Sequence, residues 1–332
     1  MHFAASSPEP GATVAVARAA MNTRFEILLQ GGDPVALRAA GEEALDEIER
    51  LEAQLSLFRP TSEIARLNRD AAHGPVRVSP NVFRLLAQAA ALSAATGGAF
   101  DPSIGPLVAC WGFHGRAGRV PDPDALAAAR ERVGMPAVEL DAAAFTVRFT
   151  RPGMTLDLGA IGKGHAIDVA LATLRDAGVP AAFLHGGTSS SAGLGHPPDA
   201  AGWKAAIPDP RPQASADQSA NSAPALLATI ALNDTALGVS GVFSKSFTQG
   251  TRAYGHVIDP RSGEPVQRAL LAAVSLPLAA DADALSTALL TLGPEGFEVI
   301  RRYRPEARML LVRPGDGPAG LAVSFDSWPS AG

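Results

Sequence analysis

The sequence predicts an α+β fold, because helix-like and strand-like segments are mixed along the chain without regular alternation. Residues 24–29 (RFEILL) predict a strand, whereas residues 34–55 place apolar side chains at the three- and four-residue spacing of an amphipathic helix. No internal repeat and no clear inter-domain linker interrupts the 332 residues. We therefore expect one main domain that combines sheets and helices.

Local capping chemistry marks where the helices begin and end. Asp33-Pro34 places a capping residue before a proline at the first helical position, which favours a helix start there. Ser79-Pro80 and Gly97-Gly98 delimit a second helix in the same manner, and a shorter one is expected from Pro123 to Val133. A polar, capped segment over residues 59–74 separates the first two helices.

The rest of the chain alternates short strands with loops. Strands are expected over residues 144–150, 203–210 and 225–233. Residues 152–178 are expected to begin with a strand that leads into a glycine-rich turn and a helix, and residues 181–195 with a strand that leads into a Gly/Ser loop. The last two flank residues 211–223, whose Pro, Ala, Ser, Gln and Asn content predicts a mobile surface insertion. Residues 1–20 are expected to be a flexible N-terminal segment, which leaves 21–332 as the folded domain.

The composition excludes several classes of protein. Hydrophobic residues make up 47% and charged residues 18%, as in ordinary soluble proteins, and the net charge of −5 without a Lys/Arg cluster argues against nucleic-acid or anionic-membrane binding. The single cysteine, Cys110, excludes an internal disulfide and a Cys-based zinc site. No apolar run is long enough to span a membrane, and the N-terminus shows neither a signal peptide nor a lipobox cysteine, so we expect a cytoplasmic protein.

The segment AADADALSTALLTLG (residues 279–293) has the periodicity of a buried helix, yet it carries Asp283 and Thr287 four residues apart on one face. A carboxylate and a hydroxyl at this spacing suit a magnesium ion, which prefers oxygen ligands. The alternative is structural: an acidic residue in the first turn complements the helix dipole, and a threonine can bond back to its own helix.

Two other segments combine glycines with polar groups. LDLGAIGKGHAID places free N–H groups and Lys163 near a helix start, which suits phosphate, although a tight strand-to-helix connection needs the same glycines. YGHVIDPRSGEPV puts His256 at the start of a short strand that ends in a turn with Asp259 and Arg261. A lone histidine is more often structural than catalytic, and these neighbours raise the odds of a catalytic role.

Taken together and in order, these segments resemble the ApbE family, the FAD:protein FMN transferases. The matching pieces are MNTRFEILL, LSLFRPTSEIARLN, TGGAFDPSIGPLVACWGF, LDLGAIGKGHAID, FLHGGTSSSAG, GVSGVF, YGHVIDPRSGEPV and DADALSTALLTLG. The resemblance implies an α+β fold of mixed sheets with flanking helices and a central FAD cleft. It also implies transfer of FMN from FAD, through a phosphoester, to a Ser or Thr of an acceptor flavoprotein, with release of AMP.

The resemblance also implies roles for individual residues. His256 is the candidate base for the acceptor hydroxyl, and the metal ligands for Mg²⁺ would be Asp283, Thr287 and the backbone carbonyl of Gly162. The residues implied to contact FAD are Met21, Phe58, Ala99, Phe100, Asp101, Gly159, His165 and Ile258.

The chain departs from the family pattern at several of these positions. His165 stands where members usually have tyrosine, so its charge near a diphosphate would depend on pH. Thr188 and Val242 stand where Asp or Asn is common. Two alternatives therefore stay open: an FAD pyrophosphatase, in which water replaces the acceptor, and a non-catalytic FAD-binding protein.

Overall fold

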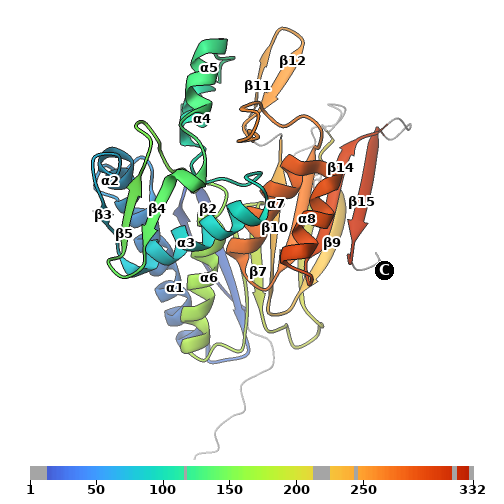
Figure 1. Ribbon diagram of the computed structural model, residues 1–332. Coiled ribbons are helices and arrows are strands. Elements are labelled where there is room, and N and C mark those ends of the chain that lie inside the picture. Colours follow the sequence, from blue (N-terminus) through green and yellow to red (C-terminus); the bar gives the residue numbers. More distant parts are fainter. Residues whose placement is uncertain (1–12, 116–117, 212–224, 243–245, 316–319, 329–332) are drawn as a thin grey trace, which may run out of the picture.

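The computed structural model describes residues 13–115, 118–211, 225–242, 246–315 and 320–328. Within them, one eight-stranded sheet forms the centre of the fold, in the order β1-β2-β6-β7-β10-β13-β14-β15 (Figure 1). Its strands are β1 (Val14–Ala20), β2 (Thr23–Gln30), β6 (Ala181–Gly186), β7 (Ser190–Leu194), β10 (Thr235–Gly241), β13 (Leu271–Leu276), β14 (Arg308–Pro314) and β15 (Leu321–Asp326). Each neighbouring pair is antiparallel. The predicted α+β class is confirmed.

The start of the domain lies earlier than the sequence predicted. Residues 1–20 were expected to be flexible, but Val14–Ala20 form β1 and pair along their full length with β2. Val14 and Val16 point into the core, so apolar burial holds this strand in place. The turn that joins the two strands contains Met21 and Asn22, both with positive φ.

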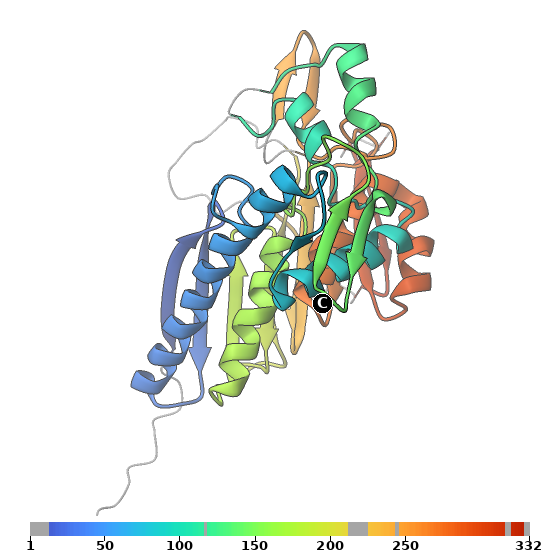
Figure 2. The ribbon, with the colours of Figure 1, turned by 60° about the vertical axis from the view of Figure 1, so that its left-hand side comes forward.

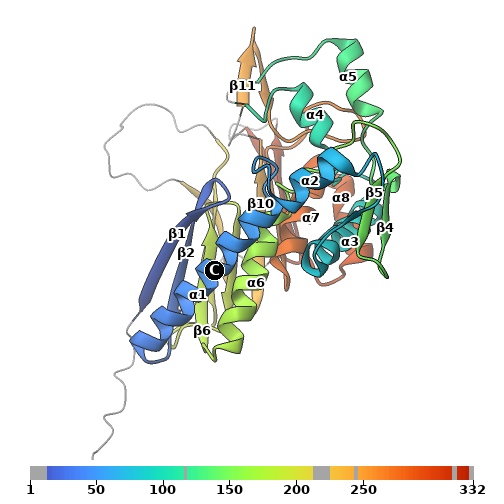
Figure 3. The same cartoon turned by 90° about the vertical axis from the view of Figure 1, so that its left-hand side faces the viewer.

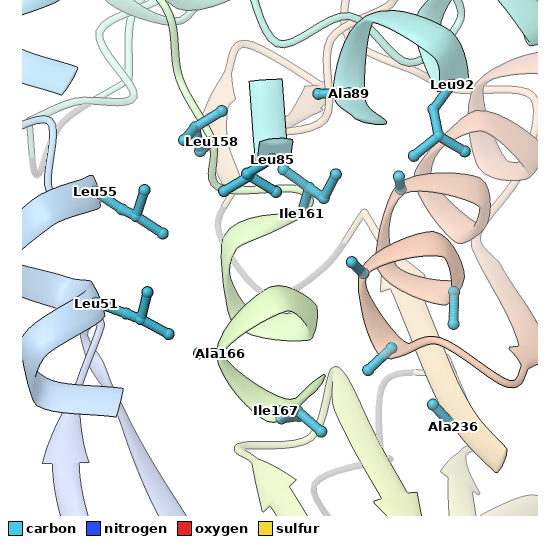
Figure 4. Packing of buried hydrophobic residues seen from close by; sticks show 14 of the residues in the cluster. Leu51, Leu55, Leu85, Ala89, Leu92, Leu158, Ile161, Ala166, Ile167 and Ala236 are labelled. Atoms are coloured by element: carbon cyan, nitrogen blue, oxygen red, sulfur yellow. The ribbon is translucent and has the colours of Figure 1, made fainter. Parts of the chain in front are cut away.

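The helices cover one face of the sheet. They include α1 (Pro34–Leu55), α3 (Pro80–Ala95), α6 (Gly162–Asp176), α7 (Ala279–Leu292) and α8 (Gly296–Tyr303). Figure 2 shows α1 and α6 side by side along the sheet, and Figure 4 shows Leu51 of α1, Leu85 of α3 and Ile167 of α6 converging on one core. As predicted, α1 begins after Asp33, whose carboxylate accepts hydrogen bonds from the backbone N–H groups of Val35 and Ala36.

A β-hairpin covers part of the opposite face. It consists of β8 (Trp203–Pro208) and β9 (Leu226–Leu232), the strands predicted on either side of the insertion. Trp203 and Ile207 of the hairpin pack on sheet residues such as Leu237 in a second core. Of the predicted insertion, residues 212–223 lie outside the described residues, as do residues 1–12 of the N-terminal segment.

Smaller elements form a separate lobe beyond one end of the sheet, as Figure 3 shows for α4, α5 and β11. The lobe contains α4 (Gly105–Cys110), α5 (Pro123–Arg130), β11 (Ser246–Gln249) and β12 (Arg252–Gly255) around a third core that includes Trp111. Next to α3 lie α2 (Glu63–Asp70) and a small sheet of β3 (Val76–Arg77), β5 (Thr146–Phe149) and β4 (Val138–Asp141).

Two predicted elements differ in the structure. The strand expected before the glycine-rich turn is reduced to an isolated bridge between Thr155 and Ile104. The Gly/Ser loop expected after β6 is a short turn followed by β7, so Ser190 and Ser191 lie inside the sheet. A run of small hydroxyl residues is typical of loops, but here antiparallel pairing on both sides outweighs that preference.

The position of α7 depends on two glycines. A Cβ added to Gly164 of α6 would lie 2.2 Å from the carbonyl oxygen of Ala279, and one added to Gly238 of β10 would lie 2.3 Å from that of Ala282. The helix therefore lies against both elements at backbone contact distance, which places its side chains close to α6 and β10.

We expect Gly164→Ala to destabilise the protein by about 1–3 kcal/mol, because the new methyl group forces α7 away from α6. The measurement is the free energy of unfolding from urea titration. Gly74→Ala is the matched control, since a Cβ there meets nothing within 4 Å. Equal stability of the two variants would contradict the tight packing of α6 on α7.

Candidate active site

The carboxylate of Asp283 lies at the N-terminus of α6. Its Oδ2 accepts a hydrogen bond from the backbone N–H of Gly164 at 2.8 Å, and its Oδ1 accepts one from the hydroxyl of Ser190 at 2.6 Å. The first turn of α6 has no side-chain cap from its own N-cap residue, Ile161, so Asp283 satisfies one of its free N–H groups. The helix dipole favours a negative charge at this point.

A second carboxylate makes the reciprocal contact. Asp168 of α6 accepts hydrogen bonds from the backbone N–H groups of Ala279 and Ala280, at 2.7 and 2.9 Å, and so caps the N-terminus of α7. Each of the two helices thus carries the capping carboxylate of the other. This exchange fixes Asp283 relative to the glycine-rich turn that precedes α6.

Thr287 lies one turn beyond Asp283, as the sequence spacing predicted. Its hydroxyl is 3.3 Å from the backbone carbonyl of Asp283 and 2.9 Å from the hydroxyl of Ser240 on β10. Asp283 and Thr287 therefore present a carboxylate and a hydroxyl from one helix, and Asp283 contacts Gly164, two residues after Gly162 in the first turn of α6.

The chemistry of these donors fits a hard divalent cation. Asp283 is only 5% exposed, and burial raises the pKa of its carboxyl, whereas the nearby Lys163 ammonium lowers it. A cation beside this carboxylate would offset the cost of keeping it ionised in the interior. The described part of the chain holds no cluster of three His, Cys, Asp or Glu side chains suited to a metal, so hydroxyl and carbonyl oxygens would complete the site.

The turn before α6 connects this site to an exposed aromatic ring through a series of contacts. The Lys163 ammonium lies 4.0 Å from Asp283 Oδ2 and donates a hydrogen bond to the backbone carbonyl of Gly159. The backbone N–H of Gly159 donates to the carboxylate of Asp157. Asp157 Oδ2 is in turn 3.0 Å from His114 Nε2. The His114 ring meets the ring of Phe58 edge-on, with the ring centroids 5.8 Å apart.

This series brings together three predicted site residues that are distant in sequence: Phe58, Gly159 and Asp283. The Phe58 side chain is 70% exposed, which is unusual for a large apolar group and suits stacking against a planar ligand. Phe58, Gly159 and Asp283 are thus linked by a series of contacts around the turn that precedes α6.

His256 lies next to the same region. The structure places it just after β12, not at the start of a strand as predicted, because only an isolated bridge between Ile258 and Pro265 follows it. Its ring meets that of Phe113, the neighbour of His114, with the centroids 6.5 Å apart. Ile258 is buried in the core of the small lobe, and its implied contact with FAD stays a prediction.

The segment from Ala99 to Asp101 is buried. Ala99 and Phe100 are 1% and 2% exposed, and their implied contact with FAD stays a prediction. The carboxylate of Asp101, another residue implied to contact FAD, accepts bonds from Ser103 and from the backbone N–H of Met135. Its role in the structure is to hold this loop against the segment that contains Met135.

A cavity of about 850 Å³ lies beside that loop, between α3, α5 and the turn after β12. Its lining includes Gly97, Gly98, Asp101, Arg130 and Arg261, but neither Asp283 nor His256. The size of this cavity therefore does not identify it as the reaction site, and we place the site where the polar contacts converge.

Met21 and His165 complete the predicted set. Met21 has a φ of 50°, which the two-residue turn between β1 and β2 requires at both of its central residues, and its implied contact with FAD stays a prediction. Burial, with a smaller effect from Arg84, lowers the pKa of His165 to about 4. The expectation of a pH-dependent charge is therefore corrected: His165 is neutral near pH 7 and gives a diphosphate no positive charge.

His165 and Asp168 should affect stability in opposite directions as the pH falls. Burial raises the pKa of Asp168 to about 6. As the pH falls below 6, Asp168 therefore takes up a proton in the folded protein before it does so in the unfolded chain, and this stabilises the folded protein. The lowered pKa of His165 has the opposite sign, because the unfolded chain binds the proton first below pH 6.5.

When the pH is lowered from 7 to 4.5, we expect the unfolding free energy of His165→Phe to rise by about 2 kcal/mol relative to that of the parent protein. For Asp168→Asn we expect it to fall by a similar amount relative to the parent. Urea titrations of the three proteins at both pH values measure this. Parallel curves for the parent and both variants would show that neither group titrates differently in the folded protein.

Comparison with known proteins decides the family. A family model described as ApbE family matches residues 21–311. The chain belongs to the ApbE family. Among its ApbE relatives, one from Treponema pallidum named FAD:protein FMN transferase is 33% identical over 291 residues, 84% of this chain and 78% of the relative. Another of the same name from Klebsiella pneumoniae is 29% identical over 98% of this chain and 89% of its own length.

Solved ApbE structures share the fold. The ApbE protein from Thermotoga maritima has a TM-score of 0.81 and 25% identity, over 95% of this chain and 97% of its own. The flavinyl transferase ApbE from Pseudomonas stutzeri has the same TM-score and 27% identity, over 97% of each chain. The predicted family and fold are thus confirmed.

Several polar residues of the site were not predicted from the sequence. Ser190, Ser240, His114, Asp157 and Asp168 all contact predicted residues or their supporting backbone. Four of them lie inside the motifs that carry the family resemblance. The sequence did not indicate their contacts with Asp283, Thr287 and the other site residues, because those contacts form only in the folded protein. Only His114 falls just outside a motif, directly after WGF.

Proposed function

We propose that this chain is a magnesium-dependent FAD:protein FMN transferase, which attaches FMN through a phosphoester to a Ser or Thr of an acceptor flavoprotein and releases AMP. Membership of the ApbE family and relatives that carry this enzyme name over most of the chain support the activity. The observation that carries the proposal is the series of contacts from Phe58 through Gly159 and Lys163 to Asp283. This series supports the proposal because it links an exposed aromatic ring to a lysine and a carboxylate suited to a diphosphate and a cation.

The reaction requires one bond to form and one to break. The acceptor hydroxyl oxygen bonds to the phosphorus of the FMN half, and the bond from that phosphorus to the bridging oxygen breaks, so AMP leaves with the bridging oxygen. His256 takes the proton of the acceptor hydroxyl, a contribution typically of about 10²–10⁴-fold. The exposed ring of Phe58 holds the flavin.

The diphosphate lies at the turn before α6. The Lys163 ammonium at that helix start binds phosphate oxygens and offsets their charge, and the helix dipole favours the same position for them. Asp283, Thr287 and the carbonyl of Gly162 would hold the magnesium ion. When bound, magnesium neutralises charge on the diphosphate as a Lewis acid and orients it for displacement.

The deciding experiment measures AMP release from FAD and Mg²⁺, with and without a peptide that carries an acceptor threonine, followed by mass spectrometry of the peptide. AMP release together with an FMN-sized mass gain supports the transferase. Free FMN with AMP and no modified peptide or natural acceptor would indicate the pyrophosphatase. Bound FAD without AMP under all conditions would indicate the non-catalytic binding protein.

A further inference from the structure

Three hydroxyl groups form a connected set beside the proposed cation site. Ser240 lies near the end of β10, and its Oγ is 2.9 Å from Ser286 Oγ and 2.9 Å from Thr287 Oγ1 on α7. Ser286 is fully buried, and its hydroxyl donates to the backbone carbonyl of Asp283 at 2.9 Å. We call Thr287, Ser240 and Ser286 the hydroxyl chain.

The protons of the hydroxyl chain can be assigned from its acceptors. Each hydroxyl has one proton to donate and two lone pairs that accept. The proton of Ser286 goes to the Asp283 carbonyl, which leaves Ser286 Oγ free to accept from Ser240. Ser240 Oγ can then accept the proton of Thr287.

The alternative acceptor for Thr287 is less favourable. The Asp283 carbonyl is 3.3 Å from Thr287 Oγ1, farther than Ser240, and it already accepts the Ser286 hydroxyl. In an α-helix the same carbonyl also accepts the backbone N–H four residues later, that of Thr287 itself. Ser240 is therefore the better partner for the Thr287 proton.

The direction of this proton matters for a cation. A hydroxyl binds a metal ion through a lone pair, so its proton has to point to another acceptor. We propose that Ser240 is a positioning residue: it accepts the Thr287 proton, and so aims the lone pairs of Thr287 at the cation. The inference rests on the proposed function, because it assumes a divalent cation at Asp283 and Thr287.

The chain also contains a suitable control for this role. Thr291 lies one turn beyond Thr287 on α7, is 2% exposed, and donates its hydroxyl to the backbone carbonyl of Thr287 at 2.8 Å. Like Ser240, Thr291 forms a hydrogen bond with Thr287 through its side-chain hydroxyl. Its partner, however, is the backbone carbonyl of Thr287 and not the Thr287 hydroxyl. Thr291→Val therefore tests the general effect of losing such a hydroxyl near Thr287.

The experiment titrates Mn²⁺ alone into the full-length protein without FAD and follows free Mn²⁺ by electron paramagnetic resonance. We expect Ser240→Ala to weaken Mn²⁺ binding about 10–100-fold, Ser240→Thr to restore it, and Thr291→Val to leave it unchanged. In the transfer assay, Ser240→Ala should raise the Mg²⁺ concentration needed for half-maximal rate, while kcat at saturating Mg²⁺ stays within a few-fold of the parent.

Two results would overturn the inference. Equal Mn²⁺ affinity of Ser240→Ala and the parent protein would show that Thr287 does not need Ser240. An equal loss in Thr291→Val would show that any disturbance around Thr287 has the same effect. Failure of the proposed function is a separate result: it appears as absence of FMN transfer by the parent protein, whatever its Mn²⁺ affinity.

Discussion

Asp283→Asn should abolish FMN transfer while the protein stays folded. The substitution keeps the size of the side chain and one acceptor for Gly164 or Ser190, but it removes the charge that would bind the cation. Because Lewis-acid stabilisation provides several kcal/mol in such reactions, we expect the rate of AMP release to fall by at least about 10³-fold. Stability should change little, since the buried carboxylate is itself costly to ionise, as its raised pKa indicates.

Asp281→Asn is the matched control for this prediction. Asp281 is equally buried and lies on the same helix, but it pairs with Arg304 and accepts from Gln88, away from the glycine-rich turn. We expect it to lose about 1–3 kcal/mol of stability and to keep its transfer activity. The two variants should therefore show opposite patterns in unfolding and activity, and normal transfer by Asp283→Asn would refute the metal assignment.

His256→Ala should slow FMN transfer about 10²–10⁴-fold and leave FAD binding nearly unchanged. The reason is that a base acts on the acceptor hydroxyl in the transition state, while the proposed contacts of FAD with Phe58 and the glycine-rich turn would remain. Single-turnover AMP release measures the chemical step, and quenching of flavin fluorescence measures binding.

His196→Ala is a suitable control for the loss of a histidine, because this residue is exposed at the other end of the sheet, after β7. Partial recovery of His256→Ala by added imidazole would support the role as a base. If His256→Ala transferred FMN at the parent rate, another group would have to take the proton. His114, which contacts Phe58 and Asp157, would then be the next candidate.

Much of the fold could be predicted because its signals are local. The cap at Asp33 and the apolar spacing of residues 34–55 act within a few residues, and α1 begins where they indicate. The strand at Val14–Ala20 was missed because its stability comes from pairing with β2 and from burial under α1, which no short window contains. The strand expected near Thr155 failed for the same reason, since it has no partner strand along its length.

The sequence by itself determined the family, the fold class and the one-turn spacing of Asp283 and Thr287, because motif order and helical periodicity are properties of the chain. Only the tertiary structure decided which groups surround them. Ser240 contacts Thr287, which is 47 residues away in the sequence, and Ser190 contacts Asp283, which is 93 residues away. The neutral state of His165 likewise follows from burial, which depends on how the helices pack and not on the residue itself.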